Sequence, residues 1–159
     1  MSASLSRWGL RSSARMSYQA GITKPQRVTL SRDGIQLRAV FKRLSTDFGI
    51  SDRQRALNLS DRFEFEIAAY RLDRLLGLDM VPVTVPRTID GRKGVLQFWI
   101  DGAINLRQMM EQKLEPGGWC VAADQYNLMN VFDVLIHNTD RTQENALFTR
   151  DWTLVLIDH

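Results

Sequence analysis

The sequence predicts an α+β fold made of two lobes, a small sheet with one helix followed by a mainly helical part. Asp33-Gly34 and the segment 90–93 (Asp-Gly-Arg-Lys) are turn sequences, and each lies between two short runs typical of strands. Residues 60–76, between these hairpins, show helical spacing, and a second long helical pattern runs from 124 to 137. The order of hairpin, helix, hairpin and then helices gives the two-lobed plan.

The composition excludes several classes of protein. The 159 residues are 44% hydrophobic and 25% charged, unlike a disordered or collagen-like chain. The single Cys120 excludes a disulfide framework within the chain and a thiolate-rich zinc or iron–sulfur site, so we expect a cytoplasmic protein. No apolar run is long enough for a membrane-spanning helix.

The charge is distributed unevenly along the chain. Residues 1–45 carry nine Lys and Arg and one Asp, which leaves twelve bases and seventeen acids for the remainder. Residues 1–20 predict a flexible basic arm, with a transit peptide as the alternative. A basic front half suits nucleic acid, a membrane surface or a phosphate site. Because its bases are single rather than clustered, we expect no nucleic-acid partner, and a membrane surface stays open.

The first half contains the elements of the small sheet. Strands are predicted at 27–31 and 35–42, and along the second strand Lys42 shares a face with Val40. A helix is predicted from Ser60, a suitable N-cap, to Leu76, with Gly77 as its C-cap.

Two further strands are predicted at 83–89 and 94–100. Pro82 and Pro86 place the first of them at a sheet edge, because proline cannot donate a hydrogen bond to a neighbouring strand.

The second half predicts a short helix near 104–112, a longer helix at 124–137 and a final hairpin. Its strands are expected at 146–148 and 153–157, joined by a four-residue loop that pairs Phe148 with Thr153. This register separates Asn145 and Asp158 by about two rungs, roughly 7 Å.

Three polar residues near the end of the chain suggest phosphoryl-transfer chemistry. Asp140 and Asn145 have the spacing D-x-x-x-x-N of a phosphoryl-transfer catalytic loop. The oxygens of Asn145 and Asp158 are the hard ligands that Mg²⁺ prefers, and Mg²⁺ also binds phosphate oxygens. Asp140 would then orient and deprotonate an incoming hydroxyl group.

The first half supplies a candidate nucleotide site. The run Ala39-Val40-Phe41-Lys42 has the form of the strand that presents a nucleotide-binding lysine. Val40 would press on adenine while the Lys42 ammonium reaches phosphate. Glu64 or Glu66 could hold Lys42 by an ion pair, and because the two point about 200° apart on a helix, only one can do so.

The segment 132–145 resembles the catalytic segment of the phosphatidylinositol 3-/4-kinase-like group, and its core Asn-Thr-Asp-Arg is most similar to that of type II phosphatidylinositol 4-kinases. It is also similar to the Golgi casein kinase family and, more loosely, to HipA-type atypical kinases. Residues 66–85 resemble the helix and following strand of bacterial members, and residues 21–30 resemble their phosphate-loop region. The resemblance implies a two-lobed protein-kinase-like fold, ATP with Mg²⁺ or Mn²⁺, and a hydroxyl acceptor on a lipid or a protein.

The resemblance also assigns roles by position. Lys42 would bind the ATP phosphates and pair with Glu66, and residues 97–102 would form the hinge against adenine. The adenine contacts would be Val40, Gln97, Trp99 and Ile100. Asp140 would be the catalytic base, Asn145 and Asp158 the metal ligands, and Arg141 would steady the loop or a phosphate.

The sequence departs from this family pattern in two places. It lacks a full glycine-rich loop, and only His159 follows Asp158, where the family continues with further helices. We therefore expect a complete small lobe at 21–102 and only the first part of the large lobe at 103–159. The alternative function is that of a pseudokinase or fragment that binds nucleotide or a partner without catalysis.

Overall fold

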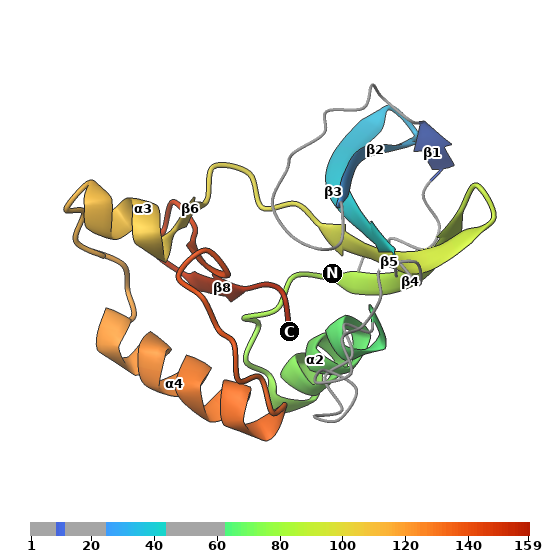
Figure 1. The fold of residues 1–159 in the computed structure, drawn as a ribbon. Helices are drawn as coiled ribbons and strands as arrows, with labels where there is room; N and C mark the ends of the chain where they lie inside the picture. The colour runs from blue at the N-terminus through green and yellow to red at the C-terminus, as the bar shows by residue number, and fades with distance from the viewer. Residues whose placement is uncertain (1–8, 12–24, 44–62) are drawn as a thin grey trace. The chain divides into compact units, whose positions relative to one another are not determined.

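The computed structural model describes residues 9–11, 25–43 and 63–159 and confirms the α+β class (Figure 1). The described residues form eight strands and three helices, with the strands in two sheets of five and three. In chain order the elements are β1 (Gly9–Arg11), β2 (Gln26–Arg32), β3 (Ile35–Arg43), α2 (Phe63–Leu76), β4 (Thr84–Ile89), β5 (Arg92–Phe98), β6 (Ile104–Asn105), α3 (Leu106–Glu111), α4 (Ala122–Leu135), β7 (Ala146–Phe148) and β8 (Leu154–Leu156).

The described chain divides into two compact units. The first contains the described residues up to Ala68 together with Val83–Trp99, and the second contains Ala69–Pro82 and Ile100–His159. Helix α2 therefore begins in the first unit and ends in the second. Each unit has a sheet and a hydrophobic core of its own.

The sheet of the first unit has the strand order β1-β2-β3-β5-β4, and all its neighbouring strands are antiparallel. Strand β4 lies at one end of this order, as Pro82 and Pro86 predicted. Strand β1 comes from the segment expected to be a flexible arm, and its residues 9–11 pair with β2. The other residues of that arm lie outside the described part of the chain.

Both hairpins of this sheet turn through an Asp-Gly pair. Asp33 and Gly34 have φ angles of 50° and 78°, and Asp90 and Gly91 have 50° and 73°. Two successive positive φ angles define a type I′ turn, whose twist matches that of the flanking strands. The four-residue turn expected at 90–93 is therefore wrong, because the turn needs only two residues and β5 already begins at Arg92.

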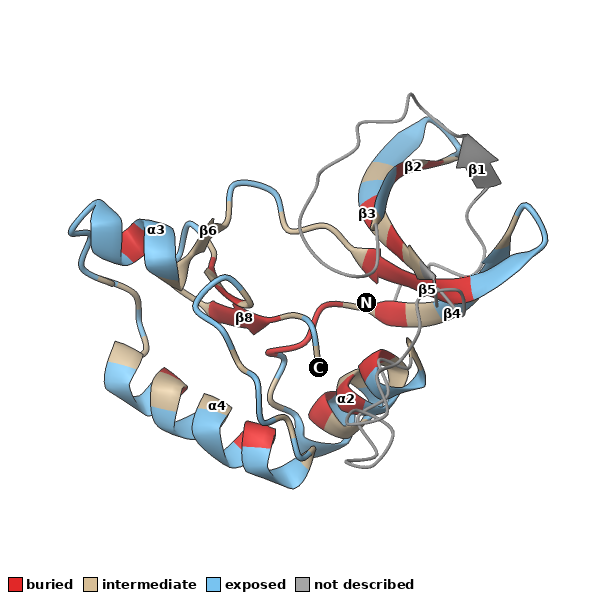
Figure 2. Cartoon of the chain, viewed as in Figure 1, coloured by how far each residue is buried: buried red, intermediate tan, exposed pale blue. Residues whose placement is uncertain are grey.

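Alternation along the strands builds the core of the first unit (Figure 2). Ala39 and Phe41 of β3 are both 1% exposed, and they pack with Val28, Leu30 and Leu96. Because successive side chains of a strand point to opposite faces, Lys42 lies on the face away from this cluster.

Helix α2 ends at Leu76 and is capped by the predicted glycine, Gly77. Gly77 has a φ of 67°, and the Leu78 amide donates to the Asp73 carbonyl at 3.1 Å while the Gly77 amide donates to the Arg74 carbonyl at 3.3 Å. These two bonds are those of a Schellman motif, which satisfies carbonyls that the helix leaves unpaired. The predicted N-cap, Ser60, lies outside the described residues.

The second unit packs a three-stranded sheet, in the order β6-β7-β8, with helices and the loop that follows α2. Its core includes Phe132 of α4, Phe148 of β7 and Leu156 of β8, each 0% exposed. The loop after α2 also bonds to β8, because the Leu156 amide donates to the Met80 carbonyl at 2.8 Å. None of the helices in the described ranges is long and apolar enough to cross a lipid bilayer.

Two helix boundaries in this unit differ from the expected ones. The segment expected as a helix at 104–112 begins with the short strand β6, because Ile104 pairs with Phe148 and Asn105 caps α3 in a reciprocal bond with Gln108. Helix α4 spans 122–135 rather than 124–137, and it stops before His137, which has a φ of 56°.

Gly94 of β5 offers a test of the packing between β3 and β5. A Cβ at this position would lie 2.8 Å from the Phe41 ring and closer still to the Lys42 carbonyl. We expect Gly94→Ala to lower the free energy of unfolding by about 2–3 kcal/mol through overpacking, measured by chemical denaturation. Gly117→Ala is the control, since its nearest neighbour would be the Trp152 Nε1 at 4.0 Å. Equal stability of the two variants would contradict the close approach.

Candidate functional site

An ion pair joins strand β3 to helix α2 within the first unit. The Lys42 Nζ lies 2.9 Å from the Glu66 Oε1, and the two side chains are only 15% and 8% exposed. Glu64 is exposed. The geometry thereby decides between the two glutamates that the sequence left open, since the one on the buried side of the helix meets the lysine.

A buried amide completes the surroundings of Glu66. The Gln97 Nε2 lies 3.3 Å from the Glu66 Oε2 and 3.1 Å from the Thr84 Oγ1. Gln97 is 4% exposed and Thr84 1% exposed. The amide that the family resemblance assigns to adenine thus points at a carboxylate and a hydroxyl of its own unit. A polar residue inside the apolar run of β5 was the only sequence signal for this contact.

The other residues assigned to adenine occupy different places. Val40 is half-buried and lies opposite Gln97 in the pairing of β3 with β5. The Trp99 amide donates to the Arg38 carbonyl at 3.0 Å, and the Arg27 guanidinium lies 4.4 Å from the centroid of the Trp99 ring. Ile100 belongs to the second unit, at the start of its stretch Ile100–His159.

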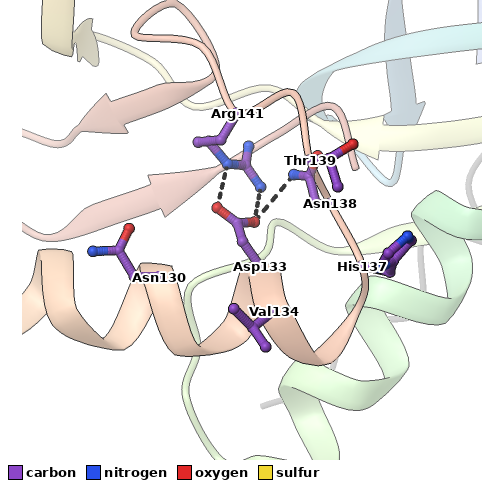
Figure 3. Close-up of a pocket in the computed structure, with 7 residues that line it drawn as sticks. All are labelled: Asn130, Asp133, Val134, His137, Asn138, Thr139 and Arg141. Atoms are coloured by element: carbon purple, nitrogen blue, oxygen red, sulfur yellow. Dashed lines mark hydrogen bonds and ion pairs between the residues drawn. The ribbon is translucent and has the colours of Figure 1, made fainter.

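In the second unit, a bidentate ion pair fixes the segment after α4 (Figure 3). The Arg141 Nε donates to the Asp133 Oδ2 at 3.0 Å and its Nη2 donates to the Oδ1 at 2.8 Å, with both side chains 10% exposed. The Arg141 Nη1 also donates to the backbone carbonyls of Asn145, at 3.1 Å, and Ile157, at 2.5 Å. Arg141 therefore steadies the loop, one of its two expected roles. Sequence reasoning missed Asp133, which occupies an ordinary position in a helix.

Helix α4 ends in a Schellman motif built on a histidine. The Asn138 amide donates to the Asp133 carbonyl at 2.8 Å, and the His137 amide donates to the Val134 carbonyl at 3.2 Å. The Asn138 Nδ2 donates to the Asp133 Oδ1 at 3.0 Å, whereas its buried Oδ1 has no hydrogen-bond partner among the described residues. His137 is thus a helix-end residue in a conformation that normally favours glycine.

The register of the final hairpin differs by one residue from the expected one. Phe148 pairs with Leu154 rather than Thr153, and the Thr149 amide donates to the Thr153 carbonyl at 3.0 Å. The loop has three residues, 150–152, and Trp152 has a φ of 63°, the left-handed residue that closes three-residue hairpin loops. The expected pairing is wrong because the left-handed Trp152 shortens the loop to three residues, and a tryptophan gives no sequence signal for this conformation.

This register brings the two expected metal ligands closer along the hairpin. The Ile157 amide donates to the Asn145 carbonyl at 3.0 Å, so Asp158 lies one residue beyond the position opposite Asn145, instead of two. The side-chain amide of Asn145 has no hydrogen-bond partner among the described residues. Oxygen donors of an amide and a carboxylate at the end of one hairpin fit the ligand preference of Mg²⁺.

Asp140 lies in the exposed segment between α4 and β7, next to Arg141. Within the described ranges its carboxylate has no hydrogen bond or ion pair. The same ranges contain no group of three or more His, Cys, Asp and Glu side chains placed to hold a metal ion.

A pocket of about 400 Å³ lies beside the end of α4 in the second unit (Figure 3). Asn130, His137 and Arg141 are among the seven residues that line it, all from α4 and the segment after it. The lining does not include Asp140, Asn145 or Asp158.

No protein-family model and no curated protein sequence matches the chain. Its candidate function therefore rests on the residues and contacts described above.

The buried ion pair of Asp133 can be tested against an exposed one. We expect Asp133→Asn to lower the free energy of unfolding by about 3 kcal/mol, because it leaves the Arg141 charge buried and uncompensated. The control is Glu144→Gln, whose partner Arg107 lies 2.6 Å away but is 60% exposed, and we expect a change of less than about 1 kcal/mol. Denaturant unfolding measures both variants, and a similar loss in each would contradict the structural role of the pair.

His137 predicts a stabilising substitution. We expect His137→Gly to raise the free energy of unfolding by about 1 kcal/mol, because glycine adopts the left-handed conformation without steric strain. The reciprocal variant is Gly77→Ala, at the same position of the cap of α2, where an added Cβ would meet no atom within 4 Å. Gly77→Ala should lower the free energy of unfolding by about 1 kcal/mol through backbone strain alone. Thermal unfolding compares the two, and a destabilised His137→Gly would show that the imidazole itself holds the cap.

Proposed function

We propose that the chain is an ATP-dependent phosphotransferase of the atypical lipid- and protein-kinase type, with a two-lobed kinase-like fold. The observation that carries this proposal is the buried ion pair between Lys42 and Glu66. An isolated strand lysine is ordinarily solvated, and burying two charges costs free energy that their attraction offsets only in good geometry. A lysine held in this way between a strand and a helix is the arrangement that protein kinases use to bind ATP phosphates.

The residues of the second unit supply the rest of the proposed chemistry. Asp140, whose carboxylate is exposed, would orient the acceptor hydroxyl and accept its proton. Asn145 and Asp158 would hold Mg²⁺, or Mn²⁺ in its place, and the bound metal would neutralise negative charge on the phosphates. Arg141 supports this arrangement because its bonds to the Asn145 and Ile157 carbonyls hold both sides of the hairpin end.

The proposed acceptor is a hydroxyl group of a lipid or a protein, in the cytoplasm or at a membrane surface. Proximity is the main contribution that such a site makes, since phosphoryl transfer depends on aligned groups and stabilised charge more than on covalent chemistry. The kinase families that the chain resembles transfer the γ-phosphoryl group of ATP, and we propose the same group here.

Nucleotide binding tests the proposal first. At a concentration of ATP and Mg²⁺ 100-fold above the dissociation constant, the chain should gain about 2.7 kcal/mol of stability, seen as a raised melting temperature. Lys42→Met should abolish most of this gain, and Asp158→Ala should remove the part that depends on the metal. The matched control is Lys93→Met, which removes an exposed lysine of the same sheet. Absence of any shift in the wild-type chain would overturn the nucleotide site.

Phosphate transfer tests the catalytic part separately. We expect Asp140→Asn to abolish transfer of the γ-phosphoryl group to lipid and protein acceptors and to leave the ATP-dependent melting shift unchanged, because the carboxylate acts on the acceptor. Transfer is measured with γ-labelled ATP. Nucleotide binding by the wild-type chain without transfer to water, lipid or protein would instead assign a non-catalytic nucleotide-binding module.

A further inference from the structure

We propose that Gln97 is a positioning residue, which with Thr84 fixes the carboxylate of Glu66 and thereby presents the Lys42 ammonium to nucleotide phosphates. This inference rests on the proposed function for its nucleotide, but its geometry is independent of that function. It gives Gln97 a role different from the adenine contact that the resemblance implies.

Both oxygens of the Glu66 carboxylate accept a hydrogen bond from a side chain of the first unit. Its Oε1 accepts from the Lys42 Nζ at 2.9 Å, and its Oε2 accepts from the Gln97 Nε2 at 3.3 Å. A carboxylate held at one oxygen can still rotate, whereas donors at both oxygens define its plane. Glu66 is 6% exposed, so protein donors rather than bulk water must satisfy most of its hydrogen-bonding capacity.

The side-chain amide of Gln97 uses its hydrogens within the protein. An amide nitrogen has two hydrogens, and here it contacts two acceptors, the Glu66 Oε2 and, at 3.1 Å, the Thr84 Oγ1. Both donors are therefore engaged inside the first unit. Because Gln97 is 4% exposed, donation to a bound base would require these contacts to break.

The strand that carries Gln97 is held on both sides. Strand β5 lies between β3 and β4, and in the two registers Gln97 stands opposite Val40 on one side and Thr84 on the other. The next residue is also fixed, since the Phe98 amide donates to the Val83 carbonyl at 2.9 Å. A side chain on a central strand is held more firmly than one on a loop, so the sheet sets where the Glu66 carboxylate can lie.

The positioning role predicts a selective defect. Gln97→Leu removes both donors at similar volume, and because a hydrogen bond to a charged group is lost, we expect binding of ATP to weaken about tenfold. Binding of adenosine, which has no phosphate for Lys42 to contact, should not change. The control is Gln36→Leu, at an exposed glutamine of β3, which should bind both as the wild type does. Calorimetry measures both ligands. Equal weakening of ATP and adenosine binding would overturn the positioning role of Gln97 and favour a direct contact between Gln97 and adenine.

Gln97→Glu adds a pH profile that a purely structural role would not produce. When its carboxyl is protonated, it can still donate to Glu66, but when it ionises, two carboxylates face each other beside the single charge of Lys42. We expect the ratio of variant to wild-type ATP affinity to fall as the pH rises and the introduced carboxyl ionises. The same ratio for Gln97→Leu should be independent of pH. A flat ratio for Gln97→Glu would overturn the proposal, and this variant keeps the side-chain shape if Gln97→Leu fails to fold.

A double-mutant cycle without nucleotide separates this inference from the proposed function. If Gln97 holds Glu66, the effects of Gln97→Glu and Glu66→Gln on the free energy of unfolding at neutral pH should not add, because the double variant exchanges the two groups and restores one carboxylate and one amide. Additive effects would overturn the positioning role whatever the nucleotide does. Coupled effects in a chain that binds no ATP would overturn the proposed function alone and leave the positioning of Glu66 supported.

Discussion

The bidentate ion pair between Asp133 and Arg141 is the contact on which the candidate catalytic segment depends. It joins α4 to the segment after it, and the same guanidinium reaches carbonyls on both sides of the final hairpin. A buried guanidinium must find acceptors for its N–H groups, so it draws these three pieces of chain to one point. Asn145 is held directly through its carbonyl, and Asp140 and Asp158 lie next to Arg141 and Ile157. Their backbone positions are thus set by a charge that itself takes no part in the proposed chemistry.

Buried carboxylates in the last turn of a helix occur twice in the second unit and create the same electrostatic problem. Asp73 in α2 and Asp133 in α4 add negative charge where the helix dipole is already negative. Each is compensated by an arginine, Arg74 at 2.6 Å and Arg141 at 2.8 Å. Each also accepts a further hydrogen bond from the residues after its helix, through the Met80 amide for Asp73 and the Asn138 side chain for Asp133. The carboxylates therefore act as anchors for the chain that leaves the helix.

The local features of the fold could be predicted because short-range sterics determine them. Asp33-Gly34 and Gly77 adopt positive φ angles that few other residues tolerate, so their turn and cap were correctly expected. His137 and Trp152 adopt the same region without such a signal, and the end of α4 and the register of the final hairpin were therefore misplaced. The two-residue strand β6 was missed for a related reason, since it exists only through its pairing with β7.

The sequence by itself determined the α+β class, the Asp33-Gly34 turn and the Gly77 cap, and it supplied the residues on which the proposed phosphoryl-transfer chemistry rests. Only the tertiary structure decided that Glu66 rather than Glu64 meets Lys42, that Gln97 lies against Glu66, and that Asp133 holds Arg141. These contacts join residues 24, 31 and 8 positions apart in the chain. Residue type and spacing specify which groups can form an ion pair, but burial removes water as a competing partner, and only packing determines which groups are buried.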